Sequence, residues 1–396
     1  MIPSYVLVLL EIAFWFSCFL VIQTYVIFPK VLDFFARDKR QNQCIWALHD
    51  EELPHVDILL AVYNEEAVIE KKLQSIFDTN YPLTHLHVYI GSDASTDNTN
   101  AIIQKYQKEF PCIKLTIFER SGKSQIINAL SRMSTSPVIV CTDANVYFEL
   151  DTLYHLVKHY KEPSIGMIGG NILNPDFKKT GISFQEKKYL ERENRMKYLE
   201  GISMGAMIGA FGGCFSIRRN LFIEVPQNWL VDDFYIGMQV LRQGKKTINE
   251  LSAICTEDVS NKMMEEFRRK VRISAGNFQN LFEFSDLMLP TKGGIAFCFI
   301  SHKVIRWITP FLFIFICMLN LILYKYGFIY KLALYGQVAL LASIVLDHFI
   351  RSFGIHVKLL RFITHFYSMN VALFVGFIRY VMGIKTSLWK PTERNQ

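Results

Sequence analysis

The sequence predicts an α/β domain joined to several membrane-spanning helices. The chain has 396 residues, of which 51% are hydrophobic and 20% charged, and a soluble protein of this length is usually more polar. Short apolar runs of strand length alternate with helical patterns over residues 56–141. Longer, almost uncharged segments lie outside that region, one near the N-terminus and three beyond residue 300.

The α/β prediction rests on regular alternation of strand and helix patterns. The expected strands are 56–62, 86–90, 114–118 and 138–141. The expected helices are 65–78, 97–109 and 123–133. Alternation at this spacing favours a parallel sheet with right-handed crossovers. The second half, 150–290, is expected to mix helices and loops, including a charged, solvated helix near 184–200.

Four apolar segments are long enough to cross a bilayer core of about 30 Å. They are 4–29, 307–324, 332–346 and 362–378, the last two extending by a few residues. Basic residues follow the first segment at once, so the positive-inside rule places the N-terminus outside and the α/β domain in the cytoplasm. Four spans then put the C-terminus outside, whereas the basic residues at 379–394 indicate a cytoplasmic tail; the sequence leaves this conflict open.

These features divide the chain into three parts. They are a membrane anchor at 1–29, a polar domain at 30–290, and an interfacial segment with about three membrane helices and a tail at 291–396. The last part holds 12 basic and two acidic residues, so the positive charge flanks the membrane segments and nucleic-acid binding is not expected. The eight cysteines are scattered without a C-x-x-C pair, which supports neither a zinc site nor a disulfide framework.

Polar residues follow three of the predicted strands. Tyr63 and Glu65 come after the first strand, Asp93 after the second, and Asp143 and Asn145 after the fourth. Ligands in such sheets bind beyond the carboxyl ends of the strands. Clustered acidic groups repel one another unless they bind a cation, a ribose hydroxyl or a base edge. A turn role for Asp93 remains the alternative.

Several other motifs have a functional and a structural interpretation. Gly122-Lys123 begins a helix and could receive phosphate, although Ile117 stands where a P-loop needs glycine. His155 and His159 are four apart but lack the other residues of a zinc motif, so surface or core histidines are favoured. Asp232-Asp233 precedes a helix, either as dipole partners or with one acid as a general base. The basic run 268–272 is either a solvated face or a diphosphate clamp.

In this order, the motifs AVYNEE, GSDASTD, RSGKSQIIN, TDAN, VDD and RRKVR resemble those of the membrane-bound inverting glycosyltransferases of family 2. That family includes cellulose, hyaluronan and poly-N-acetylglucosamine synthases. The resemblance covers about residues 55–385, and it implies a GT-A, Rossmann-like domain with N-terminal and C-terminal transmembrane helices.

The resemblance also implies roles for individual residues. Nucleotide and diphosphate contacts are expected from Tyr63, Glu65, Asp93, Lys123, Asp143, Arg269 and Arg272. A divalent metal, Mg²⁺ or Mn²⁺, is expected at Asp143 and Asn145, and Asp233 is expected to be the general base. Segment 211–219 would line the acceptor side. Ile273 stands where processive members carry tryptophan, and Gly212 where cellulose and hyaluronan enzymes carry cysteine, which makes processive synthesis less expected.

The function expected from the sequence is inverting transfer of a sugar from a UDP-sugar to a lipid-linked or glycan acceptor. The enzyme is expected in a bacterial inner membrane, in contact with membrane lipids, with its catalytic domain in the cytoplasm. The alternatives are a processive polysaccharide synthase and a non-catalytic nucleotide-sugar-binding subunit. A transporter ranks last, because only Glu11 lies well inside a charge-free stretch. The donor sugar, the acceptor and the oligomeric state stay open.

Overall fold

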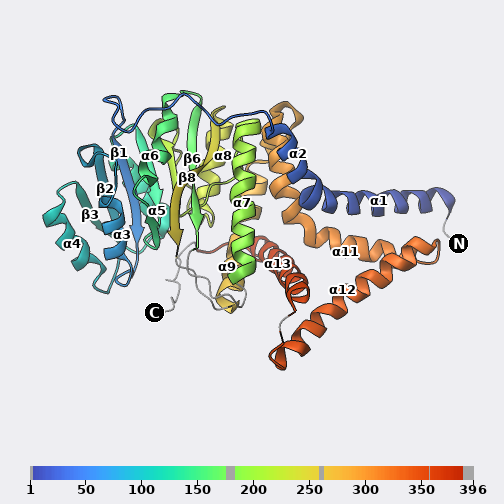
Figure 1. Ribbon diagram of the computed structural model, residues 1–396. Helices are drawn as coiled ribbons and strands as arrows, with labels where there is room; N and C mark the ends of the chain where they lie inside the picture. Colours follow the sequence, from blue (N-terminus) through green and yellow to red (C-terminus); the bar gives the residue numbers. More distant parts are fainter. Residues whose placement is uncertain (1–2, 175–182, 258–262, 356, 387–396) are drawn as a thin grey trace. The chain divides into compact units, whose positions relative to one another are not determined.

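The computed structural model describes residues 3–174, 183–257, 263–355 and 357–386. It contains two compact units, drawn in Figure 1. The α/β unit comprises the described residues within Leu32–Glu265, Gln279–Phe299 and Ile384–Gln396. The helical unit comprises those within Met1–Val31, Glu266–Phe278 and Ile300–Gly383. The helical unit is therefore assembled from three separate stretches of sequence.

One eight-stranded sheet forms the α/β unit, with strand order β3-β2-β1-β4-β7-β6-β8-β5. The strands are β1 (Val56–Val62), β2 (Leu86–Asp93), β3 (Ile113–Phe118), β4 (Val138–Thr142), β5 (Val146–Phe148), β6 (Ile165–Leu173), β7 (Cys214–Arg218) and β8 (Lys246–Glu257). The four strands predicted from the sequence are present, and β1 pairs in parallel with both β2 and β4. This half of the sheet places the ends of β1, β2 and β4 at one edge.

The second half, expected to mix helices and loops, also contributes strands, and they make the sheet mixed rather than parallel. Strand β7 runs antiparallel to both β4 and β6, and β5 runs antiparallel to β8. Strand β6 is rich in glycine because its neighbours leave no room for larger side chains: a Cβ on Gly166 or Gly170 would come within 3 Å of a neighbouring side chain. These glycines break the apolar pattern, which is why the sequence shows only helices and loops here.

Helices cover both faces of the parallel half. The helices of the α/β unit and those crossing its boundary are α2 (Phe28–Ala36), α3 (Ile69–Phe77), α4 (Thr99–Glu109), α5 (Lys123–Met133), α6 (Thr152–Val157), α7 (Ser183–Met204), α8 (Asp232–Arg242), α9 (Met263–Glu283) and α10 (Gly294–Cys298). Ile58 and Leu60 of β1 share a buried cluster with Leu73 of α3. On the opposite face, Gly91 of β2 lies under Ile126 of α5, where a Cβ would have no space. Side chains that alternate between the two faces of β1 and β2 are thus buried under helices on both sides of the sheet.

The prediction that the helix near 184–200 is solvated is wrong for one face of α7, which carries buried charged residues. Glu193, Lys197 and Glu200 are at most 3% exposed, and their spacing of four and three residues places them on one side of the helix. Asn194 on the same helix donates to the Ile172 carbonyl at 3.2 Å. Burial of charged groups is costly without partners, so this face of α7 serves more than solubility.

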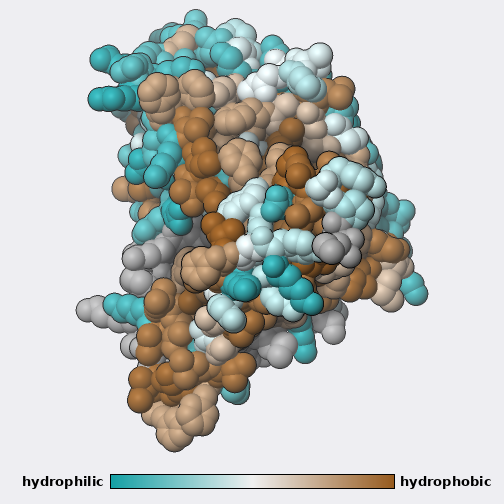
Figure 2. All heavy atoms as spheres, turned by 90° about the vertical axis from the view of Figure 1, so that its right-hand side faces the viewer, coloured by the Kyte–Doolittle hydropathy of each residue, from teal (hydrophilic) through white to brown (hydrophobic). Residues whose placement is uncertain are grey.

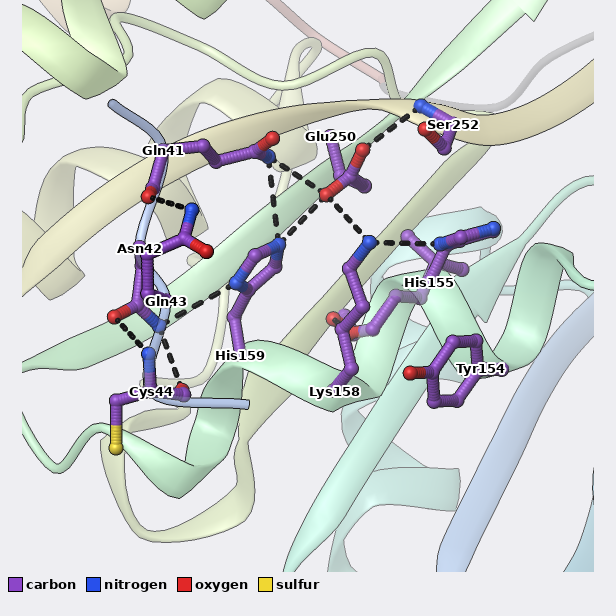
Figure 3. Close-up of polar contacts among 12 residues, drawn as sticks. Gln41, Asn42, Gln43, Cys44, Tyr154, His155, Lys158, His159, Glu250 and Ser252 are labelled. Carbon is purple, nitrogen blue, oxygen red and sulfur yellow. Dashed lines mark hydrogen bonds and ion pairs between the residues drawn. The ribbon is translucent and has the colours of Figure 1, made fainter. Parts of the chain in front are cut away.

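A buried polar network ties the segment before β1 to the sheet (Figure 3). The Glu250 carboxylate accepts hydrogen bonds from His159 at 2.6 Å and from Gln41 at 2.6 Å, and Lys158 lies 3.1 Å away. Asn42 receives the Cys44 amide on its oxygen, which turns its nitrogen toward His159 Nδ1 at 3.4 Å. His159 is therefore a core histidine whose two ring nitrogens both face protein groups, in agreement with the non-metal interpretation.

The helical unit contains helices long and apolar enough to cross a membrane. Over the described residues there are four such runs: Ser4–Ala36, Gly294–Leu323, Phe328–Ser352 and Lys358–Val381. The first two extend beyond the helical unit, at residues 32–36 and 294–299. The four runs contain α1 (Ser4–Ile22), α11 (Ile305–Leu323), α12 (Phe328–Ser352) and α13 (Lys358–Val381). Exposed hydrophobic side chains, including Leu9, Met318 and Phe349, cover much of these helices. Hydrophobic residues are brown in Figure 2 and gather over part of the surface drawn there.

Polar and close contacts join the helices of this unit. Gln23 and Thr24, in a π-helical turn after α1, bond to the Ser301 hydroxyl at 2.7 Å and the Ser301 carbonyl at 2.6 Å. Ser274 of α9 donates to the Leu373 carbonyl of α13 at 2.9 Å, and a Cβ on Gly376 would strike Ser274 at 2.3 Å. Small residues and interhelical hydrogen bonds are the usual means of packing helices in membranes.

Replacement of Glu250 tests the network of Figure 3. Hydrogen bonds and Lys158 outweigh burial and lower the pKa of Glu250 to about 2, so its ionised form stabilises the fold above the ordinary carboxyl pKa and that contribution is lost as pH falls toward 2. Glu250→Gln should cost about 3 kcal/mol at pH 7, seen as a lower Tm. The control Glu224→Gln breaks an exposed pair with Arg132 and should cost less than about 1 kcal/mol. Equal effects would contradict this account.

Candidate functional site

The loops after β1 and β2 hold each other at the carboxyl edge of the sheet. The Asn64 amide donates to the Ser95 hydroxyl at 3.1 Å, and the Glu65 amide donates to the Thr99 hydroxyl at 2.8 Å. Asn64 has a φ of 52°, a left-handed conformation that asparagine tolerates better than most residues. Glu65 is buried and its carbonyl accepts the Val68 amide. The two loops therefore form one supported wall.

Asp93 organises the segment that leads into α5. Its fully buried carboxylate accepts the amide of Ser121 at 2.6 Å and that of Gly122 at 3.1 Å, and it pairs with the Arg120 guanidinium. The guanidinium in turn lies 3.5 Å from the centre of the Tyr63 ring. Asp93 is thus buried among polar groups. Arg120, for which the sequence predicted no role, stacks its guanidinium on the Tyr63 ring in a cation–π contact at the carboxyl edge of the sheet.

Lys123 and Asp143 form the central ion pair of the site. Lys123 Nζ lies 2.6 Å from Asp143 Oδ1 and 3.5 Å from the Gly212 carbonyl. Burial lowers the pKa of Lys123, but the attraction of Asp143, Asp232 and Asp233 outweighs it and holds the pKa above its usual range. Lys123 thus carries its positive charge at neutral pH, and the Asp143 side chain is still 34% exposed.

Asp233 is at the N-terminus of α8, against the 211–213 loop. A Cβ on Gly212 would lie 3.1 Å from Asp233 Oδ2, so the absence of a side chain at Gly212 lets the loop pass close to the carboxylate. Burial and the neighbouring Asp232 raise the pKa of Asp233 to about 6, against the opposing effect of Lys123 and Lys197. A carboxyl with a pKa near 6 ionises just below neutral pH, as a general base must.

Lys72 is a further buried cation that the sequence analysis missed. Its ammonium donates to the Thr142 hydroxyl at 2.8 Å and to the Val146 carbonyl at 2.5 Å. Burial lowers its pKa to about 8. Lys72 therefore fixes both ends of the turn that carries Asp143 and Asn145. Its sequence context is an ordinary amphipathic helix, so no pattern indicates its burial.

The residues predicted to hold a divalent metal offer a suitable but small donor set. Asp143 supplies a carboxylate, and Asn145 donates through its nitrogen to Glu257 at 3.3 Å, which leaves its carbonyl oxygen as the ligand atom. The described residues contain no cluster of three His, Cys, Asp or Glu side chains suited to a metal. Magnesium commonly binds one or two carboxylates together with substrate phosphates, so these residues fit a metal that arrives with a diphosphate.

Two predicted site residues lie in the helical unit. Arg269 and Arg272 are on α9, and Arg269 is 3.6 Å from Glu266 on the same helix. Their contact with a diphosphate stays a prediction. The structure brings together Lys123, Asp143 and Asp233 of the α/β unit, and it places Asp93 with Tyr63 through Arg120.

Comparison with known families agrees with this arrangement of motifs. Residues 57–225 match the sequence model of glycosyl transferase family 2. The chain carries a family 2 glycosyltransferase domain. The matched segment contains Asp93, Lys123 and Asp143, whereas Asp233 lies just beyond it.

The similar proteins include two staphylococcal synthases and one solved mannosyltransferase. A poly-β-1,6-N-acetyl-D-glucosamine synthase of Staphylococcus aureus is 21% identical over 61% of this chain and 59% of its own length. The synthase of Staphylococcus epidermidis is 20% identical over 75% and 72%. A mannosyltransferase from Pyrobaculum calidifontis, solved with GDP-mannose and Mn²⁺, superposes with a TM-score of 0.69 at 19% identity over 95% of this chain and 98% of its own. The α/β unit thus has a GT-A-like fold with a mixed sheet.

Replacement of Asp93 tests its role in organising the glycosyltransferase domain. Asp93→Asn keeps the size of the side chain but leaves Arg120 without its buried partner, so the domain should lose on the order of 3 kcal/mol. Thermal unfolding at neutral pH measures this loss. Asp97→Asn is the control, because Asp97 has no cationic partner among the ion pairs of the described residues. It accepts the Thr99 amide at the start of α4 and the Glu66 amide, and its replacement by asparagine should cost about 1 kcal/mol. A smaller loss for Asp93→Asn than for the control would contradict the role of Asp93.

Proposed function

We propose that this protein is a membrane-anchored inverting glycosyltransferase that moves a sugar from a UDP-sugar to a lipid-linked or glycan acceptor. The observation that supports this most is the half-buried Asp233 carboxylate, with a pKa raised to about 6, beside the Lys123–Asp143 pair. A base and a cation thus meet at one edge of a family 2 domain. This is the combination that displacement at an anomeric carbon requires.

The donor nucleotide occupies the edge formed by the loops after β1, β2 and β4. Tyr63 and Glu65 would contact the uridine, together with Asp93 or the Arg120 guanidinium that it holds. Lys123 would meet the diphosphate at the N-terminus of α5, where backbone amides and the helix dipole favour negative charge. Arg269 and Arg272 of α9 would complete the charge compensation.

Asp143 and Asn145 would hold a divalent cation, Mg²⁺ or Mn²⁺, together with the diphosphate. When bound, the cation would neutralise charge on the leaving nucleotide. The mannosyltransferase of similar fold was solved with Mn²⁺, which supports a metal in general but not its identity. In this account Lys123 exchanges part of its contact with Asp143 for the diphosphate, so that its charge follows the leaving group.

Asp233 would act as the general base of a single displacement. Its ionised carboxylate takes the proton from the acceptor hydroxyl as that oxygen bonds to the anomeric carbon. The bond from that carbon to the phosphate oxygen breaks on the opposite side, and UDP leaves with the electron pair. Configuration at the carbon is inverted. Lys123 stabilises the negative charge that collects on UDP.

The four apolar helices would place this chemistry at a membrane. The basic residues that follow α1 favour a cytoplasmic α/β unit, which is where nucleotide sugars are available in a bacterium. An acceptor carried by a lipid or a growing glycan would then reach the site from the inner membrane. The staphylococcal relatives are polysaccharide synthases, so a processive synthase is the second candidate, and product length separates it from a single-transfer enzyme.

Removal of the base is the first test. Asp233→Asn should lower sugar transfer on the order of 10²–10⁴-fold and leave UDP binding within a few-fold of wild type, because the uridine and diphosphate contacts lie elsewhere. Transfer is measured as UDP release by purified protein in nanodiscs with a panel of sugar nucleotides and lipid acceptors. Unchanged transfer in the variant would exclude Asp233 as the base, and release with no donor would favour a non-catalytic binding subunit.

The pH profile follows from the raised pKa of Asp233. The base acts only when ionised, so kcat/KM should rise about tenfold per pH unit below pH 6 and level off above it. Initial rates between pH 4.5 and 8 measure this limb. An acidic limb near pH 4, the range of an ordinary carboxyl, would contradict the environment described for Asp233.

Metal removal tests the role of Asp143 and Asn145. EDTA should abolish UDP release, and Mg²⁺ or Mn²⁺ should restore it, if the diphosphate needs a cation held by these residues. Asp143→Ala should raise the metal concentration that gives half-maximal activity by at least about tenfold, in line with the loss of a ligand. Full activity in EDTA would instead leave Lys123 and the arginines as the only compensation for the leaving group.

A further inference from the structure

A buried lysine approaches the proposed base from helix α7. Lys197 is 3% exposed and belongs to the charged face that also carries Glu193 and Glu200. Glu200 accepts the Ile208 amide at 3.0 Å, so this face of α7 holds the start of the segment that continues to the 211–213 loop. The sequence predicts that α7 is solvated. The burial of Lys197 near this loop indicates that its charge has a function there.

The ammonium of Lys197 lies close to the wall in front of Asp233. It lies 3.4 Å from the centre of the Phe211 ring, and an aromatic face stabilises a cation that has lost water. The next residue is Gly212, whose missing Cβ would lie 3.1 Å from Asp233 Oδ2. The Lys197 ammonium and the Asp233 carboxylate therefore lie against two consecutive residues of one loop.

We propose that Lys197 is a positioning residue that keeps the Asp233 carboxylate ionised and oriented for proton removal. This inference rests on the proposed function, in which Asp233 is the base. Lys197 does not contact the reacting atoms in this account. It acts through Asp233, and Phe211 holds its ammonium in place.

The charges around Asp233 explain why a second cation is needed. The charged groups that act on Asp233 include Asp232 on its own helix, Lys123 on α5 and Lys197 on α7. Glu193 and Glu200 lie on the same buried face of α7 as Lys197. Burial and Asp232 favour the protonated form, and the two lysines oppose them. Lys123 is shared with Asp143 at 2.6 Å and has the diphosphate as a further partner. Lys197 therefore supplies positive charge that donor binding does not divert.

Kinetics of the full-length protein in nanodiscs test this role. Lys197→Met keeps most of the side-chain volume and removes the charge. It should move the acidic limb upward by about one pH unit, which lowers kcat/KM for the acceptor about threefold at pH 6.5 and about tenfold below pH 5.5. The affinity for UDP should change less than twofold, and Lys197→Arg should restore most of the activity. Arg195→Met is the matched control, because Arg195 is on the same helix, exposed, and paired with Asp33.

A second readout does not depend on activity. Removal of Lys197 should raise the pKa of Asp233 further. A carboxyl whose pKa is raised in the folded state loses its contribution to stability as pH rises, so the Tm of Lys197→Met should fall more than that of wild type when pH is raised from 5 to 8. That extra loss should vanish when Asp233→Asn is combined with Lys197→Met. If wild type transfers no sugar, the proposed function fails, and this stability coupling still decides whether Lys197 acts on Asp233.

Other outcomes overturn the inference. An equal loss of activity at every pH, with an unmoved acidic limb, would show that Lys197 only supports the fold. The same loss in Arg195→Met would have that meaning as well. If Lys197→Met does not fold, Lys197→Gln is measured in its place, and a wild-type pH profile in that variant rejects the proposal.

Discussion

The arrangement of this site depends on compensation of clustered, half-buried negative charge by a few fixed cations. Asp143, Asp232 and Asp233 all act on Lys123 at the carboxyl edge of the sheet, and like charges this close would repel one another without it. The backbone is built around that compensation. Lys72 fixes the turn beside Asp143, and Arg120 satisfies Asp93. A diphosphate entering this edge would exchange one anionic partner of Lys123 for another.

The glycines of the 211–213 loop make the compensation possible. The absence of a side chain at Gly212 lets the loop pass close to Asp233, while Gly213 accepts the Asp143 amide at 3.2 Å and the Thr142 hydroxyl at 2.9 Å through its carbonyl. The loop therefore connects the end of β4 to the base. Helix α7 supports it from the other end with a buried charged face. The end of β4, the 211–213 loop and helix α7 therefore all contribute to the balance of charge around Asp233.

The sequence predicts the parallel half of the fold well, because long apolar runs such as 56–62 and 138–141 are unambiguous. It does not predict β6, whose glycines hide the strand pattern, or β7, which reverses direction beside β4. Residues at strand ends, such as Asp93 and Asp143, can be found by topology alone. Lys72 and Lys197 cannot, because a lysine in an amphipathic helix looks solvated until the tertiary contacts are known. Arg120 lies within a predicted motif, but its contact with Tyr63 joins residues far apart in the sequence and is seen only in the folded structure.

The most direct measurement of the central claim is the site at which a sugar nucleotide binds. A photoreactive UDP-sugar that carries its azide on the uracil can be crosslinked to the full-length protein in nanodiscs, and the labelled peptides identified by mass spectrometry. The account predicts labelling of peptides that contain Tyr63, Arg120 or Asp143, with loss of label when unmodified UDP is added in excess. Labelling confined to other parts of the chain, or label that UDP does not displace, would contradict it.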